Sequence, residues 1–184
     1  YEHPWDSLNL NPGLSTPYLP VHAGIAGLDE ALSFRAFQLA GVPAANSHWI
    51  QFRVIDSTAE DSSTNQYAGD LRGLYLAIQD MDGALLRERG LPDGNIYSMQ
   101  SGRKHLARGA PLDGSDWNQF LGGVRNEQPE AWWRANLDLP SYYSFHAINR
   151  VIGNVDLRPD GNHGYYRRPD GRGLLPRIGQ RGPT

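Results

Sequence analysis

The sequence predicts an α+β fold, and three observations support this. Two segments, 48–56 and 71–79, have the character of neighbouring strands and are separated by a long polar connector. The second half of the chain is mainly helical, and its strongest amphipathic segment spans 141–153. A hairpin pattern follows near the carboxyl end, where "HGYYRR" and "RGLLP" flank the turn "PDG". A small strand-plus-helix half followed by a helical half is an α+β arrangement.

The first half begins with a lead-in, residues 1–26, that is rich in Pro and Gly. We expect it to be irregular, with "SLNLNPG" as the end of a strand. From residue 28 the spacing of apolar residues becomes helical, and Gly41 and Pro43 close that segment. The expected apolar stripe of this helix consists of Leu28, Leu32, Ala36 and Leu39.

An antiparallel pair of strands is expected next. In "HWIQFRVID" apolar and polar residues alternate, which predicts a half-buried strand with Ile50, Phe52 and Val54 on one face. "DSTAEDSSTNQYAGD" is a polar connector that is too long for a tight turn, and "LRGLYLAIQ" is the second strand. "DMDGALLRERG" then predicts a short helix with Asp80 as its N-cap and Gly90 as its stop.

Three helical segments are expected in the second half. "SDWNQFLGGV" and "PEAWWRANL" are short and aromatic, and we expect their tryptophans, Trp117, Trp132 and Trp133, to anchor the core; the alternative is an aromatic platform for a sugar or a peptide. "SYYSFHAINRVIG" is the best helix of the chain, capped by Ser141 and ended by Gly153. Its apolar stripe consists of Tyr142, Phe145, Ile148 and Ile152.

Composition and charge exclude several classes of protein. The 184 residues suit one domain, and 17 basic residues against 20 acidic ones leave a net charge of −3. That balance argues against a general binder of nucleic acid or membrane surfaces. No apolar run approaches the ~20 residues that a membrane-inserted helix needs. The absence of cysteine excludes disulfides and thiol chemistry.

One polar stretch carries the candidate chemistry. The chain reads "NVDLRPDGNHGYYRRPDG" from residue 154, so the best helix leads through Asp156 and Asn162 into the hairpin. The catalytic loop of protein kinases has the same order, with an Asp that accepts the proton of the substrate hydroxyl and an Asn that holds Mg²⁺. Arg158 supplies a cation that could sit against a transferring phosphoryl group. The alternative is a structural turn, because "RPDG" is also good turn chemistry.

Four stretches together resemble the CotH kinase family, a group of atypical protein kinases related to a bacterial spore-coat protein. They span roughly residues 28–171 and read, in order, "LSFRAFQLAGVPAANSHWIQFRVI", "GDLRGLYLAIQDMD", "LPDGNIYS" and "VIGNVDLRPDGNHGYYRRPDG". The resemblance implies a kinase-like fold of two lobes over residues 28–176, after a lead-in at 1–27 and before a flexible tail at 177–184. It also implies an exported, cell-surface or spore-coat location.

The resemblance further implies that ATP and Mg²⁺ or Mn²⁺ bind in the cleft, and that phosphate passes to a Ser or Thr of a protein substrate. Asp156 would be the catalytic base with Arg158 beside it, and Asp156 and Asn162 would bind the metal ion. The strand end from Ile78 to Asp82 would be the hinge near the nucleotide base. The cofactor-binding residues expected there are Gln79, Asp80 and Asp82.

The chain also departs from the family pattern. Gln79 stands where the family usually has Glu, and Ser98 stands where it often has Lys. The strands that would supply a phosphate-covering loop and an ATP-pairing lysine are either missing or confined to the irregular residues 1–26. At the other end the chain reads "RIGQRGPT" where a W-D-x-D motif is expected. We therefore expect a partial family domain, cut from a longer chain, with weak nucleotide affinity and little turnover.

Two other functions stay open at this point. One is a surface-binding module that keeps the scaffold without catalysis, and the other is a metal-stabilised structural domain. The six histidines have no zinc-site spacing. His146 is expected to be a core histidine, whereas His163 adjoins Asn162 and is a candidate at the mouth of the cleft. Arg167 and Arg168 are expected in solvated turns, the alternative being attraction of an anionic substrate.

Overall fold

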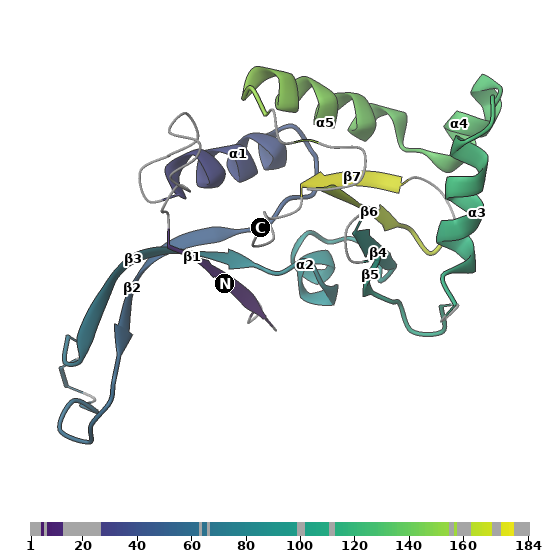
Figure 1. Cartoon of the computed structure of the whole chain (residues 1–184). Helices are drawn as coiled ribbons and strands as arrows, with labels where there is room; N and C mark the ends of the chain where they lie inside the picture. Colours follow the sequence, from purple (N-terminus) through teal and green to yellow (C-terminus); the bar gives the residue numbers. More distant parts are fainter. Residues whose placement is uncertain are drawn as a thin grey trace.

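The computed structural model describes Trp5, residues 7–12, 27–62, 64–65, 67–98, 102–110 and 113–154, Leu157, and residues 163–170 and 174–178. In these residues the chain forms two antiparallel sheets and five helices (Figure 1). The predicted α+β class is therefore confirmed. Within the same residues, no helix has both the length and the apolar character that crossing a membrane requires.

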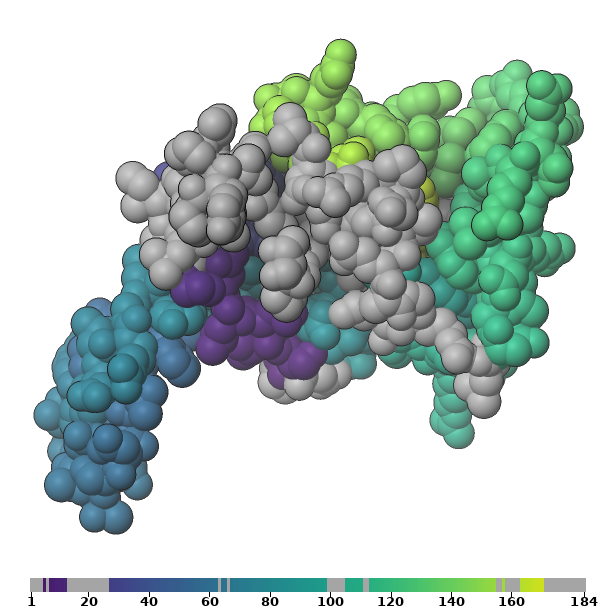
Figure 2. All heavy atoms as spheres, viewed as in Figure 1, coloured from purple at the N-terminus to yellow at the C-terminus, as the bar shows by residue number. Residues whose placement is uncertain are grey.

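The first sheet consists of β1 (Leu8–Asn11), β2 (Ser47–Val54) and β3 (Asp70–Gln79), in the order β1-β3-β2. Both pairs are antiparallel, so the predicted strand pair with its long connector is confirmed. Because β1 pairs only with residues 76–79 of β3, the rest of β2 and β3 continues as a two-stranded ribbon. This ribbon stands out from the body of the molecule (Figures 1 and 2).

The second sheet consists of β4 (Asn95–Ser98), β5 (Gly102–His105), β6 (His163–Arg167) and β7 (Leu174–Ile178), in the order β5-β4-β6-β7. β6 and β7 form the hairpin that the sequence predicts. β4 and β5 are not predicted, and the expectation of a mainly helical second half is wrong there. Each strand has only four residues, too few for a periodic pattern, and β4 is paired with β6 from far along the chain.

The five helices are α1 (Leu28–Leu39), α2 (Gly83–Glu88), α3 (Ser115–Val124), α4 (Glu130–Asn136) and α5 (Leu139–Val151). In Figure 1, α1 and α5 lie above the sheets, and α3 and α4 lie at the end of the molecule remote from the β2–β3 ribbon. The short α2 lies between the two sheets along the chain, and it directly follows β3.

The buried face of α1 is not the predicted one. Leu28, Leu32 and Leu39 are 42%, 59% and 72% exposed, whereas Phe34 and Phe37 are buried. Residues three apart lie on one face of a helix, and two phenylalanines on that face remove more apolar area from water than leucines do. The predicted leucine stripe of α1 therefore faces outward.

The apolar stripe of α5 is confirmed, but its cap is not the predicted one. Phe145 is buried, and Ile148 and Ile152 pack against the same cluster. Asp138 caps the helix, because its Oδ1 accepts a hydrogen bond of 3.0 Å from the backbone N–H of Ser141. A carboxylate at this position also interacts favourably with the positive end of the helix dipole, which a serine does not.

The main core lies between α1, β3 and α5. Its buried members are Phe34, Phe37, Val42, Ala44, Ala45, Leu76, Ile78 and Phe145. A separate cluster joins α3, α4 and α5, and there Trp117, Trp132 and Trp133 pack against the buried residues Phe120 and Leu137. The expectation that the tryptophans anchor the core is confirmed.

Gly123 in α3 allows Trp132 of α4 to approach the helix backbone. A Cβ atom at Gly123 would lie 2.2 Å from Cζ2 of Trp132, whereas one at the neighbouring Gly122 would meet nothing within 4 Å. We predict that Gly123→Ala lowers the free energy of unfolding by about 1–3 kcal/mol, because the indole must move. Gly122→Ala should raise it by up to about 1 kcal/mol through helix propensity. Urea titrations measure both, and equal effects of the two substitutions would contradict this packing.

Candidate functional site

Gln79, the last residue of β3, lies inside the protein. Its side chain is 1% exposed. Its Nε2 donates a hydrogen bond of 2.7 Å to Oε2 of Glu88 in α2, and its Oε1 accepts one of 3.3 Å from the backbone N–H of Asn46. Both polar atoms of the amide are thus used by the protein itself. Any effect of Gln79 on a nucleotide would pass through the residues that it holds.

Asn46 lies before β2 and connects Gln79 to two helices. Its carbonyl oxygen accepts a hydrogen bond of 2.9 Å from the backbone N–H of Gln79, and its Nδ2 donates one of 2.8 Å to Oε1 of Glu88. Its Oδ1 accepts from Nε2 of Gln38 at 3.2 Å and from Nη2 of Arg89 at 2.5 Å. We call Gln38, Asn46, Gln79, Glu88 and Arg89 the Asn46 network. It fixes the end of β3 against α1 and α2.

The sequence does not predict this network. Asn46 and Glu88 have no motif of their own, and they become recognisable only because β3 ends between them. The one signal is the departure at position 79. A Glu there would face the carboxylate of Glu88, whereas Gln79 supplies the N–H donor that this carboxylate accepts.

Asp80 and Asp82 converge on Ser7, which lies just before β1. The hydroxyl of Ser7 lies 3.2 Å from Oδ2 of Asp80 and 3.4 Å from Oδ2 of Asp82, so it can donate to either carboxylate. Oδ1 of Asp82 accepts from the backbone N–H groups of Ala84 and Leu85, and it therefore caps α2. The prediction that Asp80 is this cap is wrong, because Asp82 is the residue that immediately precedes the helix.

The backbone of the expected hinge is also hydrogen-bonded within the protein. The N–H of Asp80 donates to the carbonyl of Ser7 at 3.2 Å, and the N–H of Met81 donates to Oδ1 of Asp80 at 2.8 Å. β1 thus covers one edge of β3 up to its last residue. The assignment of Gln79, Asp80 and Asp82 to nucleotide binding stays a prediction.

The residues expected to perform catalysis and to bind metal lie in the segment between α5 and β6. These are Asp156, Arg158 and Asn162, and all three lie outside the described residues. The structure describes both ends of the segment and one residue within it, Leu157. These three points show how the segment is attached to the fold.

Each of the three points is held by the protein. At the end of α5, Nδ2 of Asn154 donates 2.7 Å to Oδ1 of Asn149, and the N–H of Asn154 donates 2.9 Å to the carbonyl of Asn149. Leu157 packs against the main core. At the start of β6, His163 is 8% exposed, with its ring centroid 6.4 Å from that of Phe145. The described points of this segment are thus its start on α5, Leu157 against the main core, and its end at β6.

The other histidine considered in the sequence, His146, is expected in the core. His146 is exposed on α5, where its ring packs edge-on against Tyr142 with centroids 4.4 Å apart. The prediction of a core histidine is wrong, because His146 follows Phe145 and is turned about 100° around the helix from the buried stripe.

A buried polar cluster joins α3 to the second sheet. Asp116 accepts through Oδ1 from the hydroxyl of Tyr97 at 2.5 Å, and through Oδ2 from Nδ2 of Asn95 at 3.0 Å. Nε of Arg167 lies 3.7 Å from the same Oδ2. Burial, with Asp116 beside it, raises the pKa of Tyr97, so its hydroxyl stays a donor. The indole of Trp117 stacks on the Tyr97 ring at 5.0 Å.

This cluster corrects the expectation for Arg167. The Arg167 side chain is 18% exposed and its guanidinium pairs with Asp116, so Arg167 is not a residue of a solvated turn. Arg168 pairs instead with Asp170 of the hairpin turn at 3.5 Å. Since β6 begins where the expected catalytic segment ends, the Asp116 cluster fixes the strand that follows that segment.

The chain is similar to one family of kinases over most of its length. The family model described as CotH kinase protein matches residues 27–175. Because this match covers more than half of the 184 residues, the chain belongs to the CotH kinase family. The resemblance seen in the four sequence stretches is confirmed. No curated protein matches the chain.

Gln79→Glu tests the Asn46 network. The substitution places a carboxylate oxygen where Nε2 now donates to Glu88, so a buried carboxylate meets a partly buried one. We predict that the free energy of unfolding falls by roughly 2–4 kcal/mol near neutral pH. Because the neighbouring carboxylate favours the protonated form, the introduced carboxyl has a higher pKa in the folded than in the unfolded chain. The loss should therefore be smallest at low pH and grow as the pH rises through the raised pKa.

The control for this experiment is the double variant Gln79→Glu/Glu88→Gln, which exchanges donor and acceptor. It should recover most of the lost free energy of unfolding, and its stability should depend on pH much as that of the parent chain does. Chemical denaturation at several pH values would show both. A single variant as stable as the parent at every pH would contradict the bond between Gln79 and Glu88.

Asp116→Asn tests the buried cluster in the same way. It removes the carboxylate that neutralises Arg167, where both side chains are less than one-fifth exposed. We predict a loss of roughly 2–4 kcal/mol in the free energy of unfolding. Asp70→Asn is the matched control, because it breaks an ion pair with Arg72 whose side chains are 66% and 56% exposed. That change should cost at most about 1 kcal/mol. Thermal unfolding of both variants checks the ranking, and comparable losses would argue against the cluster.

Proposed function

We propose that the protein is a CotH-type protein kinase domain that transfers the γ-phosphate of ATP to a Ser or Thr hydroxyl of a protein. The observation that carries this proposal is the family membership over residues 27–175. The first sheet with α1 and α2 would form the smaller lobe. The second sheet with α3, α4 and α5 would form the larger one.

The attachment of the segment between α5 and β6 supports the proposal. Phosphoryl transfer depends on positioning and on stabilising charge, so the groups that act must be held rigidly. The segment begins at Asn154, which bonds to α5, contacts the main core through Leu157, and ends at the buried His163. Asp156 and Asn162 each adjoin one of these points in sequence.

In the proposed reaction, Asp156 accepts the proton of the substrate hydroxyl while the oxygen of that hydroxyl forms a bond to the γ-phosphorus. The bond between that phosphorus and the oxygen bridging to the β-phosphate breaks, and ADP leaves. Arg158 would place its charge beside the phosphoryl group in transfer. This is an electrostatic role that a guanidinium fills well.

The donor chemistry of the proposed metal ligands fits Mg²⁺ or Mn²⁺. Asp156 and Asn162 offer carboxylate and amide oxygens, which hard divalent cations prefer. A bound ion would neutralise charge on the phosphates. Among the described residues, no group of three or more His, Asp or Glu side chains could hold a metal.

The nucleotide base is proposed to lie near the end of β3, at Gln79, Asp80 and Asp82. Here Gln79 acts through the Asn46 network rather than by touching the base, since its amide is fully used inside the protein. Asp80 and Asp82 lie closer to the surface, where Ser7 accompanies both carboxylates.

The proposal is tested with Asp156→Asn. We predict that transfer of label from ATP to peptides with Ser and Thr, measured in the presence of Mn²⁺ with this chain and with a version extended at both ends, falls by ~10²- to 10⁴-fold in the extended version, since a general base contributes about that much. Asp160→Asn is the matched control, because it removes a carboxylate from the same segment without removing the base.

Unchanged transfer by the Asp156→Asn variant would remove Asp156 from the mechanism. A thermal-shift titration with ATP and Mn²⁺ separates the alternatives. Stabilisation by the nucleotide together with undetectable transfer in every variant would favour the non-catalytic binding module. A response to the metal ion alone would favour a metal-stabilised structural domain.

A further inference from the structure

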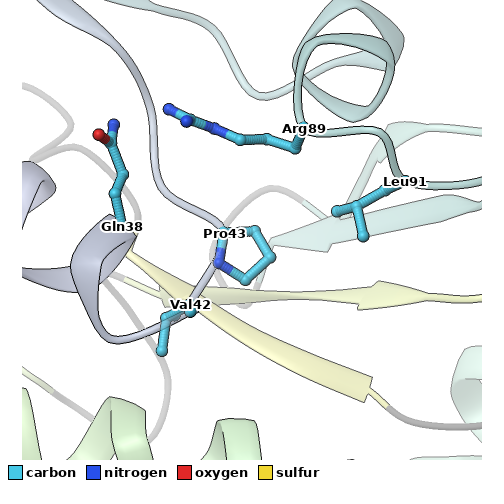
Figure 3. A pocket seen from close by; sticks show the side chains of 6 residues that line it. Gln38, Val42, Pro43, Arg89 and Leu91 are labelled. Carbon is cyan, nitrogen blue, oxygen red and sulfur yellow. The ribbon is translucent and has the colours of Figure 1, made fainter.

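A small cavity lies between the end of α1 and the end of α2 (Figure 3). Its volume is about 180 Å³, and it is lined by Gln38, Gly41, Val42, Pro43, Arg89 and Leu91. In Figure 3 the Arg89 side chain extends along one side of the cavity towards Gln38, with Pro43 and Val42 opposite and Leu91 at the end. The cavity thus combines a polar wall with an apolar floor.

Among the described residues, the acceptors of the guanidinium on this wall are neutral. Nη2 of Arg89 donates 2.9 Å to the carbonyl of Ala44 and 2.5 Å to Oδ1 of Asn46. Its Nε is buried without a hydrogen-bond partner and is shut off from the cavity, so the cavity meets the charge of the guanidinium and not this N–H. Nε is also unpartnered in Arg53 and Arg168, but neither of these residues lines the cavity.

The charges around Arg89 leave an excess of one positive charge. Arg35 and Glu88 are the neighbouring charges that act on it. Both carboxylate oxygens of Glu88 already accept from amides, those of Asn46 and Gln79. Arg35 is exposed and donates to Oε1 of Gln38 at 3.3 Å. Among the described residues, two guanidinium groups therefore stand against one carboxylate, and that carboxylate does not line the cavity.

We propose that this cavity binds a carboxylate on a short apolar stem, such as the side chain of a glutamate that a partner protein presents. A single negative charge neutralises the excess around Arg89, which a phosphate dianion would exceed. The methylene groups of the stem would contact Val42, Pro43 and Leu91, while the carboxylate meets Arg89.

This site does not depend on phosphotransfer. It is formed by α1, α2 and the residues between α1 and β2, and none of the residues proposed for catalysis lines it. It is nevertheless joined to the end of β3, because Arg89 and Gln38 both donate to Asn46, which holds Gln79.

The test is a nuclear magnetic resonance titration of the full chain with capped peptides. The two probes are Ala-Glu-Ala and Ala-Gln-Ala, which differ in one charge and hardly in shape. The glutamate peptide should move the side-chain amide signal of Gln38, the N–H signal of Gly41 and the Nε–H signal of Arg89 in a saturable way. The glutamine peptide should leave them in place. Equal responses to the two peptides, or none to either, would overturn the proposal.

Two variants locate the binding. Arg35→Glu, at an exposed position, should weaken binding of the glutamate peptide by about tenfold through lost attraction. Arg125→Glu, at the exposed end of α3, makes the same charge change away from the cavity and should change affinity less than about twofold. Arg89→Gln should abolish binding if its spectrum stays that of a folded chain. If the Arg89→Gln variant does not fold, the affinity of the Arg35→Glu variant is the test of the proposal. Equal weakening by Arg35→Glu and Arg125→Glu would overturn the assignment.

Further probes distinguish the sources of the carboxylate. Saturable binding of the glutamate peptide without binding of propionate supports a protein partner. Equal binding of propionate supports a site for a small carboxylate from any source. Binding of inorganic phosphate in the absence of binding by either carboxylate would overturn the choice of ligand.

Discussion

The bond between Asn46 and Gln79 is the constraint on which the arrangement of the first sheet and its helices depends. The two residues are joined twice, since the N–H of Gln79 donates to the carbonyl of Asn46 and the N–H of Asn46 donates to Oε1 of Gln79. A hydrogen bond of this kind adds on the order of 1 kcal/mol, but a buried amide left without partners costs about 1–3 kcal/mol. The network therefore stabilises the protein only when all its members are in place, and it favours this one arrangement of β3 with α1 and α2.

Periodic patterns predicted most of the fold, and burial by distant partners accounts for the errors. The strand pair, the C-terminal hairpin and the stripe of α5 follow from alternation or helical spacing within one segment. The buried face of α1 does not, because Phe37 is buried through contact with Phe145 of α5. β4 likewise depends on β6. In each failure the deciding contact comes from another part of the chain, which the local pattern does not contain.

The candidate site likewise has one part with a local sequence pattern and one part that depends on distant contacts. The helix and the hairpin on either side of the Asp and Asn pair are confirmed, because each has a local pattern in the sequence, while the role of the pair itself stays a prediction. The surroundings of Gln79 could not be predicted. The side-chain amide of Gln79 donates to Glu88, which belongs to the next helix. Oε1 of Gln79 accepts from the backbone N–H of Asn46, before β2. The sequence shows only that Gln79 replaces the Glu usual in the family, and the structure supplies the physical reason why an N–H donor suits that position.

Arg167 and Arg89 are both partly removed from water, and they differ in the groups that accept hydrogen bonds from them or neutralise their charge. Arg167 has a carboxylate, because Asp116 lies 3.7 Å from its Nε and is itself held by Tyr97 and Asn95. Arg89 has a backbone carbonyl and an amide oxygen, and the neighbouring Glu88 is bonded to amides instead. Removing a charge from water is costly, and burial accordingly lowers the pKa of Arg89, with the nearby Glu88 opposing this in part. Within the described residues the first arginine is enclosed by its partners and the second borders an open cavity. A folding role alone explains Arg167, whereas at Arg89 a ligand from outside would supply the missing charge.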